Sequence, residues 1–330
     1  MTRSTRVVVS ASIAYDYIMH FDGSFADHIL QDKAHTLSVS FLLDSFKRQH
    51  GGVAGNMVYN LSLLGVPTSL VGTVGQDFGS YRAKLENLGV DLSHVIQDDD
   101  DFTATAFMNA DNVGNQIASF YPGSSADAQK IDVTDIASTA AYGIVSAGDP
   151  GAMVKHTEEI AAADGCELIF DPAFQIVILS PEQIARGIEL ADIVIGNDYE
   201  FGMMTNKTGL SVDDIAARRP MTVITYGSRG SEIRANGESH LIPIAPTKQF
   251  GDPTGGGDAY RAGLIAGLLI GADLPVAGRM AALTSTHAIE YHGAQEHIFT
   301  PEGFVKRFDE SFPDYAGAVS VEALAGLAAQ

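Results

Sequence analysis

The stretch "GDPTGGGDAYRAG" at residues 251–263 decides how the C-terminal part of this sequence folds and what it can bind. It places three consecutive glycines before Asp258, and the apolar run "LIAGLLIG" follows at once. From Tyr260 onward the apolar spacing predicts a helix packed on a core. The glycines therefore stand at the N-terminus of that helix, where free N–H groups and the helix dipole favour an anion. A phosphate group fits such a site.

Asp258 falls in the first turn of this helix. A carboxylate there is often only a helix cap, but a cap does not explain why Gly255, Gly256 and Gly257 precede it. We therefore interpret Asp258 as a general base beside an anion hole, an arrangement suited to phosphoryl transfer, where positioning and charge stabilisation supply most of the catalysis. The helix N-terminus is expected to favour the ionised carboxylate.

Short β-branched runs alternate with helix-like segments along most of the chain. Strands buried on both faces are predicted at residues 6–13, 68–75, 142–148, 167–173, 192–197 and 221–227. Helices are predicted at residues 56–65, 79–89, 153–165 and 181–191. This alternation predicts an α/β fold with a three-layer, doubly wound, mostly parallel sheet. Residues 231–245 contain Asn236-Gly237 and predict a hairpin at the edge of the sheet.

Two stretches do not follow this alternation of strands and helices. Residues 14–48 and 102–122 show alternating patterns and turn signals, and "NADNVGN" at 109–115 is typical of a hairpin loop. We expect these stretches to pair into a small β-sheet lid. Residues 1–13, 49–101 and 123–330 would then form the α/β core.

Composition excludes several classes of partner. The 330 residues are 45% hydrophobic and carry a formal net charge of -21, which opposes binding to nucleic acid or to an anionic membrane. The apolar run at 262–272 is shorter than the ~20 residues that a membrane span needs. The single Cys166 cannot form an internal disulfide and is interpreted as a packed thiol. We expect a cytoplasmic protein.

Common nucleotide and metal motifs are missing from the sequence. There is no G-x-x-x-x-G-K-[ST] of a P-loop, and no G-x-G-x-x-G follows a strand. His287, His292 and His297 are spaced by five, which does not align ligands on one helical face, so no structural zinc is predicted.

The quoted stretch resembles a known signature. "DPTGGGDAYRAG" is similar to the D-T-x-G-A-G-D-x-F-x-A-G of the ribokinase/PfkB family of carbohydrate and nucleoside kinases. Further stretches resemble the family's motifs in order along nearly the whole chain: "GGVAGN" (51–56), "VGTVGQDFGSYRAKLENLGVD" (71–91), "NDYE" (197–200), "TYGSRG" (225–230) and "HGAQE" (292–296). The resemblance implies a ribokinase-like fold and a kinase that uses ATP.

The resemblance also implies a role for each motif. Asp258 would remove the proton of the acceptor hydroxyl while the N–H groups of residues 255–258 stabilise the transferring phosphoryl group. Glu200 and Asn197 would organise water around Mg²⁺, which prefers to keep several waters. Taken alone, "NDYE" could be only a helix cap.

ATP would meet the chain at a second loop. Thr225, Gly227 and Gly230 follow a predicted strand and by resemblance touch the ATP phosphates, although such a loop by itself is usually a plain turn. His287 lies on a predicted helix, at 276–291, where the family lines its adenine pocket; a core or surface histidine is the alternative.

A monovalent cation is a further implication of the resemblance. Asp252, together with backbone groups near Ala288 and Gly293, resembles the family's site for such an ion. Its oxygen ligands would suit K⁺.

The acceptor alcohol is assigned to the other side of the site. Asp16, at the end of the first predicted strand, matches the family's aspartate that binds sugar hydroxyls, and Gly52 and Asn56 complete that grip. A carboxylate that accepts from two vicinal hydroxyls suits a ribose or another polyol.

The sequence of the predicted lid gives information about the acceptor alcohol. "NQIASFYPGSS" at 115–125 resembles the nucleoside and adenosine kinase branch, so Gln116 and Phe120, or Tyr121, would border a base; alternatively the aromatic residues form the lid's own core. Residues 102–122 contain no Lys or Arg, so a lid cation for the γ-phosphate would come from Lys47 or Arg48.

These features favour ATP-dependent phosphorylation of the 5′-hydroxyl of a nucleoside, with adenosine first. A sugar kinase of the ribokinase or fructokinase type is the alternative, and a catalytically silent binding protein is a second one. An exposed lid edge could also pair with another copy to form a homodimer.

Overall fold

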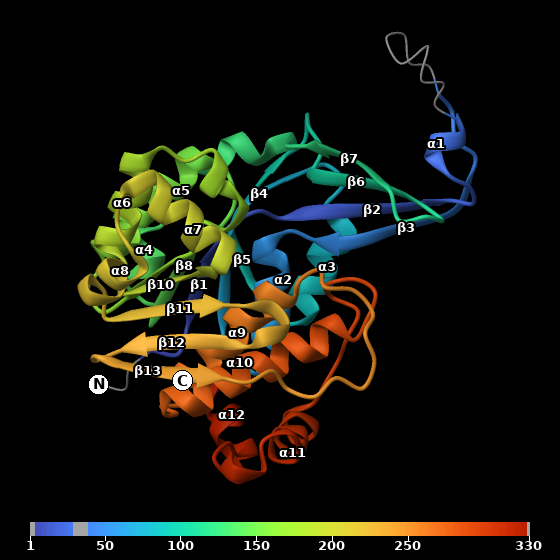
Figure 1. Ribbon diagram of the computed structural model, residues 1–330. Helices are drawn as coiled ribbons and strands as arrows, with labels where there is room; N and C mark the ends of the chain where they lie inside the picture. The colour runs from blue at the N-terminus through green and yellow to red at the C-terminus, as the bar shows by residue number, and fades with distance from the viewer. Residues whose placement is uncertain (1–3, 29–38, 329–330) are drawn as a thin grey trace.

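A nine-stranded sheet forms the centre of the molecule (Figure 1). The structure, a computed structural model, describes residues 4–28 and 39–328; the part of the predicted lid at 29–38 lies outside the described residues. The strand order of the nine-stranded sheet is β13-β12-β11-β10-β9-β8-β1-β4-β5. The strands are β1 (Val7–Ser10), β4 (Thr68–Gly75), β5 (Asp91–Asp98), β8 (Tyr142–Val145), β9 (Glu167–Phe170), β10 (Ile193–Asn197), β11 (Met221–Thr225), β12 (Ser231–Ala235) and β13 (Glu238–Ile242).

The strands from β11 to β5 in this order pair in parallel, and β12 and β13 form an antiparallel hairpin at one edge. The hairpin turns at Asn236 and Gly237, which both have positive φ, as the sequence predicts. Strand β5 was not among the strands predicted from the sequence. Its sequence "DLSHVIQD" is mostly polar because it lies at an edge, so it lacks the apolar run of a central strand.

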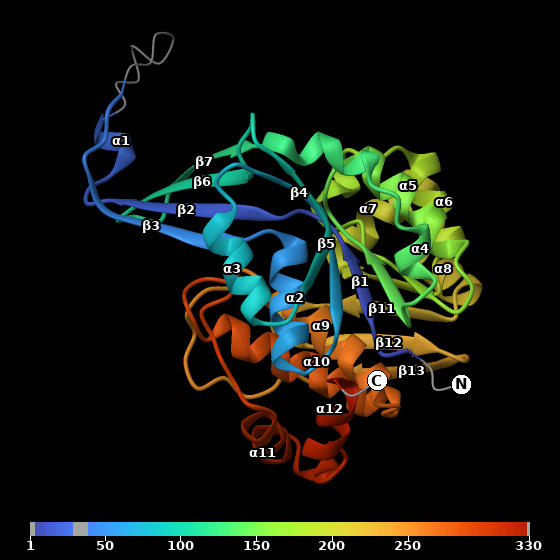
Figure 2. The same ribbon diagram turned by 180° about the vertical axis from the view of Figure 1, so that it is seen from behind.

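Helices cover both faces of the sheet and give the predicted three layers (Figures 1 and 2). One face carries α2 (Val53–Leu63), α3 (Gly79–Asn87), α9 (Gly256–Leu269), α10 (Leu274–Ile289), α11 (Pro301–Ser311) and α12 (Val321–Ala328). The other carries α4 (Thr134–Ala137), α5 (Pro150–Ala161), α6 (Pro181–Leu190), α7 (Asp198–Thr208) and α8 (Val212–Arg218). Strand β1 faces both layers, because Val7 and Val9 enter one core and Val8 the other. Among the described residues no helix is long and apolar enough to cross a bilayer.

Local capping explains where α5, α6 and α7 begin. Asp149 accepts a hydrogen bond from the N–H of Ala152 and Pro150 follows it, so α5 starts there. Ser180 and Gln183 form a capping box on α6, and Asn197 and Glu200 form one on α7.

A smaller sheet, called the lid sheet below, stands at the carboxyl edge of the large one (Figure 2). It has the order β3-β2-β6-β7 and consists of β2 (Ala14–Phe21), β3 (Leu43–Gly51), β6 (Ala104–Asp111) and β7 (Gln116–Tyr121). The short helix α1 (Phe25–His28) follows β2. Strand β2 pairs antiparallel with β3 and parallel with β6, and β6 and β7 form the predicted hairpin. Asp16 lies within β2 rather than at the end of β1.

Candidate active site

Residues 255–258 form the head of α9, as the glycine run predicts. Gly255 is the N-cap, with φ at 77°, a left-handed conformation that favours glycine. The N–H of Gly256 already donates to the carbonyl of Pro253 at 3.1 Å. The N–H groups of Gly255, Gly257 and Asp258 donate to no described residue. Three of the four expected donors are therefore free to bind an anion.

The carboxylate of Asp258 is held by a chain of amides. Its Oδ2 accepts a hydrogen bond from Nδ2 of Asn56 at 2.9 Å, and Oδ1 of Asn56 accepts one from Nε2 of Gln295 at 3.0 Å. The same Nε2 donates to the hydroxyl of Tyr81 at 2.5 Å. Because Asn56, Gln295 and Tyr81 are all buried, Asp258 has a fixed orientation.

Burial reverses the expected effect of the helix on Asp258. The sequence predicts that the helix N-terminus favours the ionised form, but burial raises the pKa of Asp258 to about 7. The positive charge of Arg261 and the hydrogen bond from Asn56 lower it only in part. The desolvation outweighs the dipole because the carboxylate lies in the cleft rather than on an open helix end. A carboxylate with a pKa near neutrality is a stronger base than a surface aspartate.

A buried ion pair lies one helical turn beyond Asp258. Nε of Arg261 is 2.5 Å from Oδ2 of Asp171, and Nη2 donates to Oδ1 at 2.7 Å. Asp171 is fully buried and also accepts from the hydroxyl of Ser146. Glu200 stands beside this pair: its burial and the charge of Asp171 raise its pKa, and Arg261 opposes that rise.

Asn197 and Glu200 occupy the start of α7 at the same edge of the sheet. Oε2 of Glu200 accepts from the N–H of Asn197 at 2.7 Å, and the N–H of Glu200 donates to Oδ1 of Asn197 at 2.8 Å. Both residues are thus helix caps. Within the described ranges no group of three His, Cys, Asp or Glu side chains could hold a metal by itself. Asp171, Glu200 and Asp258 outnumber Arg261, however, so the charge around them suits a divalent cation that keeps its waters.

Thr225, Gly227 and Gly230 line a cavity of about 410 Å³ that reaches Gly256 and Gly257. The cavity thus joins the "TYGSRG" loop to the head of α9. Its apolar lining includes Ile244, Ala245, Phe250, Tyr260, Ala282 and Ile289. Its size and mixed lining suit a cofactor-sized ligand.

His287 lies outside the residues that line this cavity. Its helix is the predicted one, but its ring packs on Phe299 and Phe304, and its Nδ1 is 3.3 Å from Nη1 of Arg307. Arg307 in turn pairs with Glu290 at 2.6 Å. The structure therefore supports the core histidine that the sequence left as the alternative. Burial lowers the pKa of His287 to about 3, so it stays neutral.

Asp16 faces the head of α9 from the lid sheet. Burial, assisted by the charge of Asp252, raises its pKa to about 6. A side chain at Gly51 would collide with this carboxylate, whereas a side chain at Gly52 would collide with the backbone of Ser12 and Ala14. Gly52, with φ at 82°, adopts a conformation that would strain any other residue, and its neighbour Gly51 makes the room for Asp16.

Phe120 shares the face and the row of Asp16. Asp16 pairs with Ala106, and Ala106 with Phe120, so the three side chains lie on one face of the lid sheet. Phe120 is 77% exposed there. Gln116 is on the same face, but its row contains His20, four residues along β2, or roughly 13 Å farther out.

Asp252 lies in the loop before the glycine run. Its Oδ1 accepts from the N–H of Thr254 at 2.8 Å, and its own N–H donates to the carbonyl of Ile289 at 3.2 Å. Gly251 packs against the backbone of Tyr291. The loop is thereby placed beside the end of α10, next to the segment with Ala288 and Gly293.

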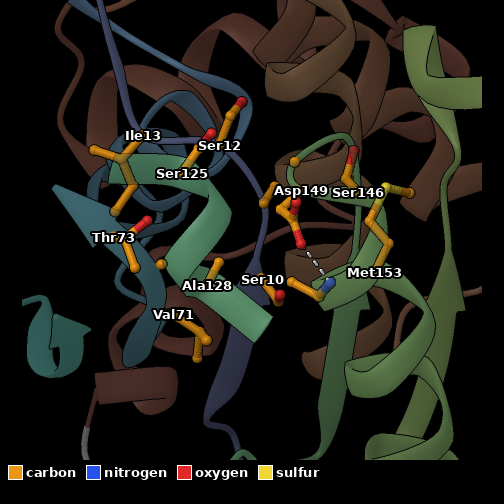
Figure 3. Close-up of a pocket in the computed structure, with 14 residues that line it drawn as sticks. Ser10, Ser12, Ile13, Val71, Thr73, Ser125, Ala128, Ser146, Asp149 and Met153 are labelled. Atoms are coloured by element: carbon orange, nitrogen blue, oxygen red, sulfur yellow. Dashed lines mark hydrogen bonds between the residues drawn. The ribbon is translucent and has the colours of Figure 1, made fainter. Parts of the chain in front are cut away.

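A second hollow at this edge of the sheet is much smaller (Figure 3). It is lined by residues from the ends of β1, β4 and β8, including Ser12, Thr73, Ser146 and Asp149. Its volume of about 20 Å³ holds little more than one water. Asp149 is already used as the cap of α5. This hollow is too small for a substrate.

Comparisons with known proteins agree with this geometry. A model of the pfkB family of carbohydrate kinases matches residues 15–301. The chain belongs to the pfkB family. A nucleoside kinase of Methanothermobacter thermautotrophicus is 32% identical over 312 residues, which cover 93% of this chain and 97% of that protein. This pfkB family member is therefore an ATP-dependent phosphotransferase with an alcohol acceptor.

Solved structures place the same chain among ribokinase-like folds. A nucleoside kinase of Burkholderia thailandensis in complex with inosine has a TM-score of 0.83 and 36% identity, over 93% of this chain and 98% of that chain. The same kinase in complex with ADP-inosine gives 0.81 and 37%, over 93% and 96%. The nucleoside kinase of Methanocaldococcus jannaschii gives 0.85 and 26%, over 94% and 100%.

Four residues of the candidate site were not found as site residues from the sequence. Gln295 and Tyr81 stand within the "HGAQE" and "GSYRAKLENLG" stretches, so their motifs were visible, but the hydrogen bonds of Gln295 to Asn56 and to Tyr81 were not. Arg261 and Asp171 are 90 residues apart and nothing local in the sequence pairs them.

Proposed function

We propose that this chain transfers the γ-phosphoryl group of ATP to the 5′-hydroxyl of a nucleoside, with adenosine as the first substrate. One observation carries the proposal. The carboxylate of Asp258 is oriented by Asn56 at the head of α9, between the cavity at Gly256 and Gly257 and the carboxylate of Asp16. A base, an anion site and a hydroxyl-binding acid thus converge.

The chemistry needs little beyond these groups. Asp258 takes the proton of the 5′-hydroxyl as its oxygen forms a bond to the γ-phosphorus, and the bond to the β,γ-bridging oxygen breaks to release ADP. The free N–H groups of Gly257 and Asp258 stabilise charge on the transferring group, with Gly255 beside them. The Gly256 N–H contributes to the turn through Pro253 instead.

ATP would occupy the 410 Å³ cavity, with its phosphates between Thr225, Gly227 and Gly230 and the head of α9. Mg²⁺ would be held mainly by phosphate and water, with Glu200 and Asn197 placing those waters. When bound, it neutralises charge on the phosphates.

Asp16 and Asn56 would bind the acceptor. Asp16 accepts hydrogen bonds from the ribose hydroxyls, and Gly52 brings the backbone close. Phe120 provides an exposed aromatic face in the row of Asp16, where a base can stack. Gln116 would contact the base only if the lid sheet closes over it, since its row is farther out.

Asp252 would hold K⁺ together with backbone carbonyls near Ala288 and Gly293. Its carboxylate keeps an oxygen that the turn to Thr254 does not use. Because an ion there would lie near the head of α9, we expect K⁺ to raise kcat. Comparing K⁺ with Na⁺ at equal ionic strength tests this.

We also propose a homodimer through the lid sheet. The face opposite Asp16 carries Tyr17 stacked on Phe107 at 5.2 Å, with Phe46 at 5.5 Å from Tyr17. Phe46 is 60% exposed and Ile117 46% exposed, which is unusual for large apolar side chains unless a partner covers them. Light scattering of the wild-type chain and of a Phe46→Ser variant decides between dimer and monomer.

A coupled assay of ADP release tests the main proposal against adenosine, inosine, cytidine, ribose and fructose. We expect the highest kcat/KM with adenosine, and ³¹P NMR of the product should show a 5′-monophosphate. Inosine is the matched competitor because it differs only in the base. Turnover of ribose or fructose without any nucleoside would assign a sugar kinase, and binding without turnover a silent binding protein.

A further inference from the structure

The inner face of the lid sheet offers no fixed positive charge to the transferring phosphoryl group. Strands β6 and β7 contain no Lys or Arg. Arg48 is in the row of Tyr17, on the outer face; it donates to the carbonyl of Asp77 at 3.2 Å and stacks on the ring of Tyr15 at 3.7 Å. Lys47 faces inward, but it is exposed and lies two residues farther out than Asp16.

The core does hold a fixed positive charge, that of Arg261, whereas the inner face of the lid sheet holds none. The buried ion pair with Asp171 uses Nε and Nη2, and the third nitrogen, Nη1, donates to no described residue. Nη1 lies against Gly257: a Cβ on that glycine would be 2.8 Å from it. Nη1 is thus beside a free N–H donor of the helix head.

Asp171 prevents the guanidinium from moving. It contacts Arg261 through both oxygens, its hydroxyl partner is Ser146, and its N–H donates to the carbonyl of Val145 at 3.0 Å. One hydrogen bond, from Nη2 to Oδ1, and the close contact of Nε with Oδ2 restrict the position of the guanidinium, although Nε itself makes no hydrogen bond. They leave Nη1 as a preorganised donor.

The surrounding charges also require a cation here. Asp171, Asp258 and Glu200 act on Arg261, and the three acids together would repel a triphosphate. In the described chain no ion pair joins Arg261 to Asp258 or Glu200, so Nη1 is not committed to either.

We propose that Arg261, and not a lid residue, donates from Nη1 to an oxygen of the γ-phosphoryl group during transfer, and that Asp171 is its positioning residue. This inference rests on the proposed kinase function. Arginine is suited to the role because its planar fork can bind a carboxylate on one edge and a phosphate on the other. The glycine at 257 is then needed for the guanidinium as well as for the N–H.

A purely structural role is the competing explanation, since removing Arg261 leaves Asp171 buried and unpaired. The double variant Arg261→Met/Asp171→Asn removes both charges. If Arg261 only balances Asp171, the double variant regains the activity that Arg261→Met loses. If Arg261 contacts the phosphoryl group, the double variant stays impaired.

The test measures kcat and the Kd of ADP and of β,γ-imido-ATP for both variants and for Arg261→Lys. We expect kcat to fall about 10²- to 10³-fold in Arg261→Met and in the double variant. The imido analogue should lose about tenfold or more in affinity while ADP, which lacks the γ-phosphoryl group, changes less than about threefold. Arg261→Lys keeps a point charge and should recover part of kcat.

Two controls accompany these variants. Arg186→Met removes an exposed arginine of α6 and should leave kcat unchanged. Lys47→Met should lower kcat less than about threefold, because an exposed lysine is weakly fixed. Recovery of kcat in the double variant, or equal losses for ADP and the imido analogue, would overturn the proposal. A wild-type chain that transfers no phosphoryl group would instead refute the proposed function, and the analogue-to-ADP comparison would still report on Arg261.

Discussion

The head of α9 and the inner face of the lid sheet are built in opposite ways. Around Asp258 the neighbouring side chains are held at defined distances: Asn56 through Gln295 on one side, and Arg261 through Asp171 on the other. On the lid sheet, Phe120 is 77% exposed and Lys47 is exposed too. The groups around Asp258 are therefore preorganised, whereas these two lid side chains are not held by the rest of the fold.

Replacing Asp258 by Asn should have the largest effect. The variant keeps the shape and the contact to Asn56 but cannot accept a proton, so kcat should fall about 10³-fold. Nucleoside affinity, measured by calorimetry, should change little because Asp16 and Asn56 remain. A variant that turned over at the wild-type rate would remove Asp258 as the base.

Loosening the support of Asp258 should cost less. In Gln295→Leu, Asn56 loses the donor that fixes its Oδ1, so the carboxylate is less well oriented, and kcat should fall about 10- to 10²-fold. Because the carboxylate is still present, the pH dependence of kcat should keep its shape. Steady-state kinetics from pH 5.5 to 9 measure both, and an unchanged kcat would mean that the orientation comes from elsewhere.

A change on the lid should move KM rather than kcat. Phe120→Ala removes a stacking face, which is worth about 1–3 kcal/mol per base, so KM for adenosine should rise about tenfold. Ribose, which has no base, provides the internal comparison, because its binding should not respond. Ser119→Ala, one residue away on the opposite face, is the matched control.

The smallest effect is on stability. The pKa of Asp258 is raised from 3.8 to about 7, so the folded chain binds a proton that the unfolded chain has lost, and this contribution disappears as pH rises through about 7. Since pH 5 lies above the unfolded pKa, part of the contribution is already lost there, and Asp258→Asn should raise Tm by a few degrees at pH 8 and by less at pH 5. Asp135→Asn, an exposed site on α4, should show no such difference. Equal Tm shifts at both pH values would contradict the raised pKa.

Much of the fold could be predicted because the signals are local. The buried strands, the helix after the glycine run and the Asn236-Gly237 turn follow from spacing and turn chemistry. The parallel pairing of β2 with β6 could not be predicted, since it joins segments about ninety residues apart, such as Ala14 and Ala104.

The site, too, could be predicted only where its residues are close together in the sequence. The glycines and Asp258 form one contiguous motif, but their environment depends on distant residues. His287 is on the predicted helix, yet Arg307 and Phe304 from α11 enclose it. The direction of the Asp258 pKa was predicted incorrectly because burial, which comes from the tertiary fold, exceeds the local helix effect.

The pH dependence of kcat/KM for adenosine tests the central claim most directly. If Asp258 is the base, kcat/KM should fall as pH drops below about 7, where Asp258 becomes protonated, and Asp16 should steepen the fall near its pKa of about 6. His50, which pairs with Tyr15 in the lid sheet, and His297 do not account for this step, because burial lowers the pKa of each to about 4. The step near 7 should persist in Asp16→Asn. A profile that stays flat from pH 8 to pH 5 would contradict the account.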